Sequence, residues 1–152
     1  AHSCQTLVSN VEAAAFHEEF FRHRADEYGP RIRGAIETGM MIPGVRYVQA
    51  QRLRRQLRQD LIETVRQVDV LMTPATPAPA PEDLNTTGDP VFQQPWTSAG
   101  LPTIVLPSGL AGSGLPLAIQ LAGLPLDEVR LLAAARWCES ALGVSLSPPD
   151  YS

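Results

Sequence analysis

The sequence predicts an α/β fold with a mixed sheet and flanking helices, and three observations support this prediction. Residues 45–68 repeat apolar side chains every three or four positions, which is the period of an amphipathic helix. Residues 116–123 alternate with a period of two, as a strand does. An apolar run at 103–109 precedes them, and the glycine-rich stretch 110–115 joins the two runs, so together they predict a β-hairpin.

Two shorter helices are expected before the long one. Ser9 and Glu12 form the S-x-x-E pattern of a capping box, so the first helix is expected to begin there and to stop before Gly29-Pro30. Proline suits the first turn of a helix, which favours a second helix over 31–38. Gly39 is expected to end that helix.

The segments around the hairpin are also predicted from local patterns. Residues 69–73 are expected to form a short buried strand. Residues 74–81 include four prolines and are expected to be extended and irregular, and 82–95 are expected to form a surface loop. The last helix is expected to have Asp127 at its positive end and Gly143 as its C-cap.

The second strand of the hairpin is apolar on both faces. Leu117, Ile119 and Leu121 share one face, while Gln120 is the single polar residue on the other. We therefore expect both faces of this strand to be covered.

Composition narrows the function classes. The 152 residues have a net charge of −4, which gives no reason to expect a nucleic-acid or membrane partner. No apolar run approaches the roughly 20 residues that span a bilayer, and the N-terminus has no signal-peptide pattern. Cys4 and Cys138 are interpreted as reduced thiols of a cytoplasmic protein. The chain lacks an initiator methionine, so we expect a processed protein or a fragment.

Several possible catalytic or binding motifs are incomplete. His17 and His23 are six positions apart and cannot share a helix face as zinc ligands do at i and i+4, so no metal site is expected. Ser98, Ser108 and Ser113 lie near glycines, but none has glycine at both −2 and +2 as a nucleophile elbow requires. All 12 basic residues are arginine, so a mechanism that needs lysine cannot be performed by this chain alone.

Two further patterns have a structural explanation that we prefer. The stretch GLAGSG at 109–114 resembles a phosphate loop in composition, but a strand follows it where a phosphate loop needs a helix. The cluster of Arg52, Arg54, Arg55 and Arg58 on the long helix is followed by acidic residues. It favours a solvated helix face, or one salt-bridged to a partner domain, over a phosphate or nucleic-acid site.

The order of the motifs resembles the C-terminal portion of the amidase signature family. DVLMTPATP at 69–77, GLPTIVLPSG at 100–109 and GLPLAIQLAG at 114–123 are specific in combination, and the similarity extends from about Val11 to Gly143. It implies the mixed-sheet fold of that family and amide-bond hydrolysis by a Ser–cis-Ser–Lys triad. In the family the triad lies in an upstream glycine- and serine-rich segment, so no catalytic residue is assigned here, and no cofactor is expected.

The resemblance also suggests which residues contact substrate. The hairpin strands would support the site, while the loop before them, VFQQPWTSAG at 91–100, would line a pocket. Gln93, Gln94, Trp96 and Thr97 are the candidate substrate-binding residues, although the same stretch is also explained as an exposed loop.

One branch of the family comprises the A subunits of tRNA-dependent amidotransferases. The resemblance implies for that branch an acidic residue and an asparagine where this chain has Pro90 and Thr97, and basic residues where it has Gly34 and Ala35. These departures favour a general amidase of undefined substrate.

Three hypotheses follow. The first is an amidase whose 152 residues form one C-terminal fragment, with helices at 11–68, strands and a proline-rich loop at 69–123, and a helix at 126–143. Its partners would be a small-molecule amide and the missing catalytic portion or another subunit, with a possible homodimer. The second is a non-catalytic module, and the third, least favoured, is an arginine-rich nucleic-acid binder.

Overall fold

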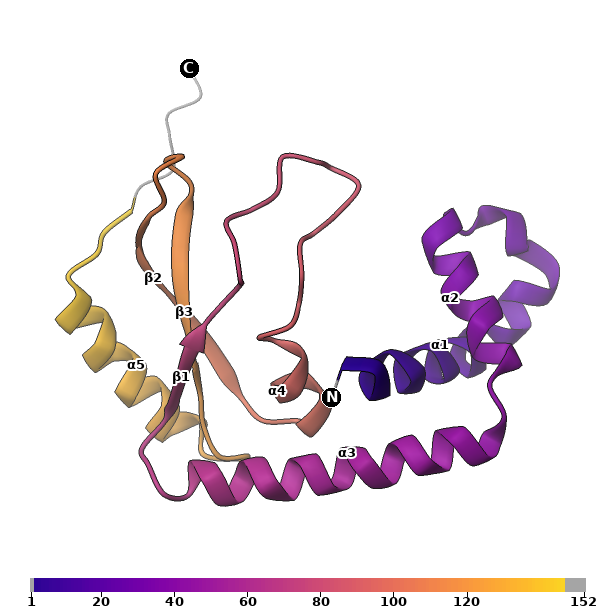
Figure 1. The fold of residues 1–152 in the computed structure, drawn as a ribbon, viewed down its shortest axis with the longest axis horizontal. Coiled ribbons are helices and arrows are strands. Elements are labelled where there is room, and N and C mark those ends of the chain that lie inside the picture. The colour runs from indigo at the N-terminus through magenta and orange to yellow at the C-terminus, as the bar shows by residue number, and fades with distance from the viewer. Residues whose placement is uncertain (1, 147–152) are drawn as a thin grey trace. The chain divides into compact units, whose positions relative to one another are not determined.

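The computed structural model describes residues 2–146. The chain divides into two compact units, Ala1–Leu57 and Arg58–Ser152. The α/β prediction is confirmed, since helices surround a small sheet in the second unit (Figure 1). None of the helices within 2–146 combines the length and apolar character needed to cross a bilayer.

The first unit is helical. Its elements are α1 (His2–Arg24), the short 3₁₀ helix η1 (Ala25–Glu27), α2 (Pro30–Met41) and the larger part of α3 (Gly44–Val65). The helices α1 and α2 pack against each other. Its buried apolar side chains are Val8, Ala14, Ile36 and Ala50.

The predicted start of the first helix is wrong. Ser9 lies inside α1, which already begins at His2. Contacts of the first turns explain the difference, because Val8 is only 1% exposed and the Cys4 thiol donates to the Ala50 carbonyl at 3.1 Å. Packing of these residues therefore extends the helix beyond its local start signal.

Gly39 does not end the second helix either, since α2 continues to Met41. The residue is buried, and a Cβ placed on it would lie 2.0 Å from the Asn10 carbonyl oxygen. Glycine at this position lets the backbones of α1 and α2 approach closely.

The long helix is confirmed, with small shifts of its ends. It begins at Gly44 and ends at Val65, so Val68 lies beyond it. Its expected apolar stripe is only partly covered: Ala50 and Val65 are buried, whereas Leu53 is 63% exposed.

The second unit contains β1 (Leu71–Pro74), α4 (Gln94–Ala99), β2 (Thr103–Leu110), β3 (Pro116–Ala122) and α5 (Glu128–Leu142). The hairpin is confirmed as β2 and β3, and the sheet order is β1-β3-β2 (Figure 1). Both of these pairings are antiparallel, so the described strands include no parallel pair of the kind expected in a mixed sheet. Leu121 on the central strand faces Met72 on one side and Ile104 on the other. As expected, 75–92 contain no helix or strand.

Burial along β3 changes at its middle. Gln120, Leu121 and Ala122 are at most 2% exposed, whereas Leu117 is 39% exposed. Leu121 packs in a cluster with residues of α5, and Ala122 packs in a second cluster with Trp96. Coverage on both faces is therefore confirmed for the C-terminal half of β3 and wrong for its first residues, which these clusters do not reach.

The C-terminal helix follows the prediction closely. α5 begins after Asp127 and ends at Leu142, and its C-cap Gly143 adopts the left-handed conformation with φ +60°. Leu131, Ala135 and Cys138 form its buried stripe. Cys4 is half-buried and Cys138 is buried.

Candidate functional site

The segment with the four candidate substrate-binding residues is helical where a loop was expected. α4 spans Gln94–Ala99, and Gln93 is its N-cap. Pro95 lies in the first turn, where its fixed φ suits a helix, and Gly100 closes the helix with φ +64°. Proline and glycine therefore mark the two ends of a short helix.

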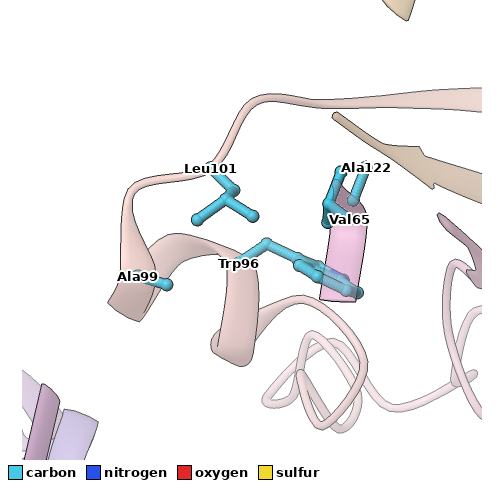
Figure 2. Close-up of a cluster of buried hydrophobic side chains, with 5 residues drawn as sticks. All are labelled: Val65, Trp96, Ala99, Leu101 and Ala122. Atoms are coloured by element: carbon cyan, nitrogen blue, oxygen red, sulfur yellow. The ribbon is translucent and has the colours of Figure 1, made fainter. Parts of the chain in front are cut away.

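Trp96 points into the protein core. Its ring extends from α4 toward Val65, in a cluster that also includes Ala99, Leu101 and Ala122 (Figure 2). The side chain is 7% exposed, and its indole Nε1 has no hydrogen-bond partner among residues 2–146. Burial of the large ring is the main contribution of this side chain to the cluster.

The other three candidates are more accessible. Thr97 is exposed, while Gln93 and Gln94 are half-buried. The Gln94 Oε1 atom is itself buried without a hydrogen-bond partner in the described part of the chain. Gln93 and Thr97 are one helical turn apart and therefore share a face of α4. The structure thus separates Trp96, which packs inward, from Gln93 and Thr97.

The beginning of this segment is held by Gln120 of β3. Its side chain is 2% exposed, and Nε2 donates to the Phe92 carbonyl at 3.1 Å and to the Thr73 hydroxyl at 3.4 Å. The sequence marked Gln120 only as the polar exception in an apolar strand. That exception was a signal for a buried hydrogen-bonding group.

The end of the segment is held by Arg58 of α3. Its Nη1 donates to the carbonyls of Ala99 and Gly100, the latter at 3.1 Å. Carbonyls at a helix C-terminus lack partners within the helix and have partial negative charge, so a guanidinium suits this position. The sequence pattern placed Arg58 in a solvated arginine cluster and gave no sign of this contact.

The other arginines of that cluster differ in their surroundings. Arg54 approaches Glu12 of the same compact unit at 3.8 Å. Arg52 and Arg55 are exposed.

The three serines that the sequence singled out belong to the second unit and differ in exposure. Ser98 is 2% exposed, Ser108 is half-buried and Ser113 is exposed. His17 belongs to the first unit, where its Nδ1 lies 3.0 Å from the Tyr28 hydroxyl. Within 2–146, no group of three His, Cys, Asp or Glu side chains is arranged to hold a metal ion.

A groove of about 670 Å³ lies in the second unit, between the start of β1 and α5. An ion pair between Asp69 and Arg130 borders it, and this contact raises the pKa of Arg130 above its ordinary value. The remaining lining residues are mostly apolar: Val68, Val70, Met72, Ala133, Ala134, Trp137 and Cys138. None of the four candidate substrate-binding residues lines this groove.

Comparison with known proteins identifies the family. The family model described as Amidase matches residues 2–132. The chain belongs to the amidase family. The sheet and helices described above are therefore an amidase-family structure.

Similar proteins agree with this assignment. The chain is 34% identical to the A subunit of the glutamyl-tRNA(Gln) amidotransferase of Rhizorhabdus wittichii, with 92% of this chain and 31% of the relative covered. It is 40% identical to the corresponding protein of an Anaeromyxobacter species, with 68% of this chain and 23% of the relative covered. A solved amidase superposes with a TM-score of 0.86 at 28% identity, covering 93% of this chain and 35% of the amidase. The matched region thus spans between 23% and 35% of the length of these proteins.

Proposed function

We propose that this chain is the C-terminal part of an amidase that hydrolyses carbon–nitrogen amide bonds. In this proposal a Ser–cis-Ser–Lys triad is supplied by a segment outside these 152 residues. The family match over residues 2–132 is the observation on which the proposal rests. The absence of lysine from the sequence fits it, because the triad's base cannot come from this chain.

In the complete enzyme this chain would supply scaffold and one wall of the substrate pocket. A pocket wall needs polar groups at fixed positions, and α4 offers the side chains of Gln93 and Thr97 on one face. Gln94 and Trp96 remain in the proposed set. Burial of Trp96 suggests that it supports the wall from behind.

A second candidate function is that of the A-type component in a tRNA-dependent amidotransferase. The curated relatives named above are such components, which favours this alternative. Pro90, Thr97, Gly34 and Ala35 stand where the resemblance implies an acidic residue, an asparagine and basic residues in that branch. We therefore keep the general amidase as the main proposal. In both versions we propose a cytoplasmic protein without nucleic acid or membrane bound directly to this chain.

The test compares two species. The native polypeptide that contains this sequence would be isolated from its host through a C-terminal affinity tag. Its intact mass, its labelling by a fluorophosphonate probe and its hydrolysis of simple aliphatic and aromatic amides would be measured beside the 152-residue chain. We expect a native species much heavier than 16.5 kDa that is labelled and active, and an inactive 152-residue chain.

Three outcomes would change the proposal. Amide hydrolysis by the 152-residue chain itself would refute an external triad. A native species of 16.5 kDa without activity would favour a non-catalytic module. Glutamine-dependent amide transfer by a native multisubunit complex would establish the amidotransferase alternative.

A further inference from the structure

The main chain of α4 and its flanking residues is anchored at both ends by side chains from distant parts of the sequence. Gln120, 28 positions after Phe92, donates to the Phe92 carbonyl at 3.1 Å. Arg58, 41 positions before Ala99, donates to the carbonyls of Ala99 and Gly100. All of these residues belong to the second unit. The two anchors enclose the whole stretch 92–100, which includes every candidate substrate-binding residue.

Gln120 anchors the segment through the hydrogen bonds of its side-chain amide. A side chain of similar volume without these hydrogen bonds would not replace it. The side chain is 2% exposed and stands between buried apolar neighbours on β3. A buried amide is stable only when its hydrogen bonds are made, and the shorter of its two bonds goes to the main chain of Phe92. Replacing it by leucine would fill much the same space while leaving the Phe92 carbonyl without its donor.

The Arg58 anchor lies at the C-terminal end of α4. Gly100 and Leu101 turn the chain out of α4 through bonds from their N–H groups to Thr97 and Trp96 carbonyls. The guanidinium of Arg58 adds a charged donor to the next carbonyls along, those of Ala99 and Gly100. Hydrogen bonds to charged groups are stronger than those between neutral groups, so this contact fixes the exit of the helix.

Between the anchors, two side chains do little to fix the segment by hydrogen bonding. Trp96 Nε1 and Gln94 Oε1 are buried without a hydrogen-bond partner among the described residues. A six-residue helix is also too short to be stable by itself. Its position therefore depends on the burial of Trp96, Ser98 and Ala99 and on the two main-chain anchors.

We propose that Gln120 and Arg58 are positioning residues, which orient the Gln93 and Thr97 face of α4 toward an amide substrate without contacting it. This inference rests on the proposed function of the complete enzyme. It assigns a specific role to the buried side chain of Gln120 and to Arg58, one of the four clustered arginines. Substrate orientation affects binding and reaction geometry, so loss of either anchor should weaken catalysis without removing a reacting group.

The first part of the test uses the 152-residue chain and hydrogen exchange, which needs no catalysis. Gln120→Leu and Arg58→Met are compared with Arg55→Met, which removes an exposed arginine of the same helix. We expect the amides of Thr97, Gly100 and Leu101 to exchange on the order of tenfold faster in both anchor variants, with the β2–β3 amides still protected. Arg58→Lys, which keeps the charge and one donor group, should restore part of the protection.

Two results of this first part would overturn the proposal. One is unchanged exchange in the segment, and the other is an equal rise across the whole sheet, which would mean general destabilisation. If Gln120→Leu does not fold, Thr73→Val and the two Arg58 variants decide. Thr73→Val should leave the segment protected, because the Phe92 bond remains.

The second part uses the native polypeptide and a small amide substrate. We expect Gln120→Leu and Arg58→Met to lower kcat/KM at least about tenfold, mainly through KM, while Arg55→Met matches the parent. Faster exchange with unchanged kcat/KM would overturn the positioning role and leave the proposed function intact. A parent polypeptide with no amide activity would refute both proposals, whatever the exchange measurement shows.

Discussion

The helical unit and the sheet unit achieve close packing in opposite ways. In the helical unit, α1 and α2 touch where Gly39 has no side chain. In the sheet unit, large side chains fill the space between elements, with Leu121 fully buried between α5 and the strands. Packing of the helical unit therefore depends on the absence of a Cβ at Gly39, and packing of the sheet unit depends on the large side chain of Leu121. Adding a side chain should therefore destabilise the helical unit, and shortening a side chain should destabilise the sheet unit.

The largest effect is expected in the sheet unit. Leu121→Ala removes a fully buried side chain and should lower the free energy of unfolding by about 2–5 kcal/mol, because a cavity remains. Urea denaturation followed by Trp96 fluorescence, in a Trp137→Phe background, measures this loss. Leu117→Ala on the same strand is the control, since 39% exposure should keep its cost below about 1 kcal/mol. Equal losses at the two positions would contradict the burial pattern of β3.

The helical unit should respond next most strongly, to an added methyl group. In Gly39→Ala the new Cβ would lie 2.0 Å from the Asn10 carbonyl oxygen and 2.9 Å from the Ala14 Cβ. The helices must separate, which should cost about 1–3 kcal/mol by far-UV circular dichroism melts. Gly34→Ala, on the same helix with open space around it, should instead stabilise by up to about 1 kcal/mol. If both variants were stabilised, the close contact of α1 and α2 would be refuted.

A smaller loss of stability is expected at the two glycines that end helices of the sheet unit in the left-handed backbone conformation. Gly100 and Gly143 have φ of +64° and +60°, so alanine at either should cost about 1 kcal/mol from backbone strain. Gly100→Ala should cost more, because its Cβ would also crowd the Arg58 Nη1 at 3.1 Å, whereas Gly143 has open space. Thermal melts of both variants in the parent and Arg58→Met backgrounds test this. The difference should shrink when Arg58 is absent.

The smallest effect is expected at the border of the groove. Asp69 and Arg130 form an ion pair, but their side chains are 83% and 53% exposed. Exposed pairs contribute little because water and salt screen them. Asp69→Asn should therefore leave the melting temperature unchanged within error at high salt. A clear loss under that condition would mean that the pair is covered in solution.

Local patterns predicted the elements better than their limits. The long helix, the hairpin and the C-terminal helix were each found, because their periods of 3.6 and 2 reflect which faces are buried. The start at Ser9 and the end at Gly39 were wrong. A capping box and a glycine are local signals, and contacts made by Cys4, Val8 and Asn10 outweigh them.

For the candidate site, too, the sequence showed less than the structure did. Sequence alone proposed the stretch 91–100 as the candidate site, and proline and glycine within it mark the ends of α4. It did not show that Trp96 turns inward while Gln93 and Thr97 share a face. A short helix flanked by loops has too little periodicity to reveal its buried side.

The sequence by itself determined the absence of lysine, the resemblance to amidases and the order of the main helices and strands other than α4, since these depend on residue type and spacing. Only the tertiary structure decided which polar side chains form hydrogen bonds with residues far away in the sequence. Gln120 reaches Phe92 and Arg58 reaches Ala99 and Gly100 because folding brings together residues 28 to 42 positions apart. No local pattern encodes such contacts, because their geometry depends on how the strands and helices pack.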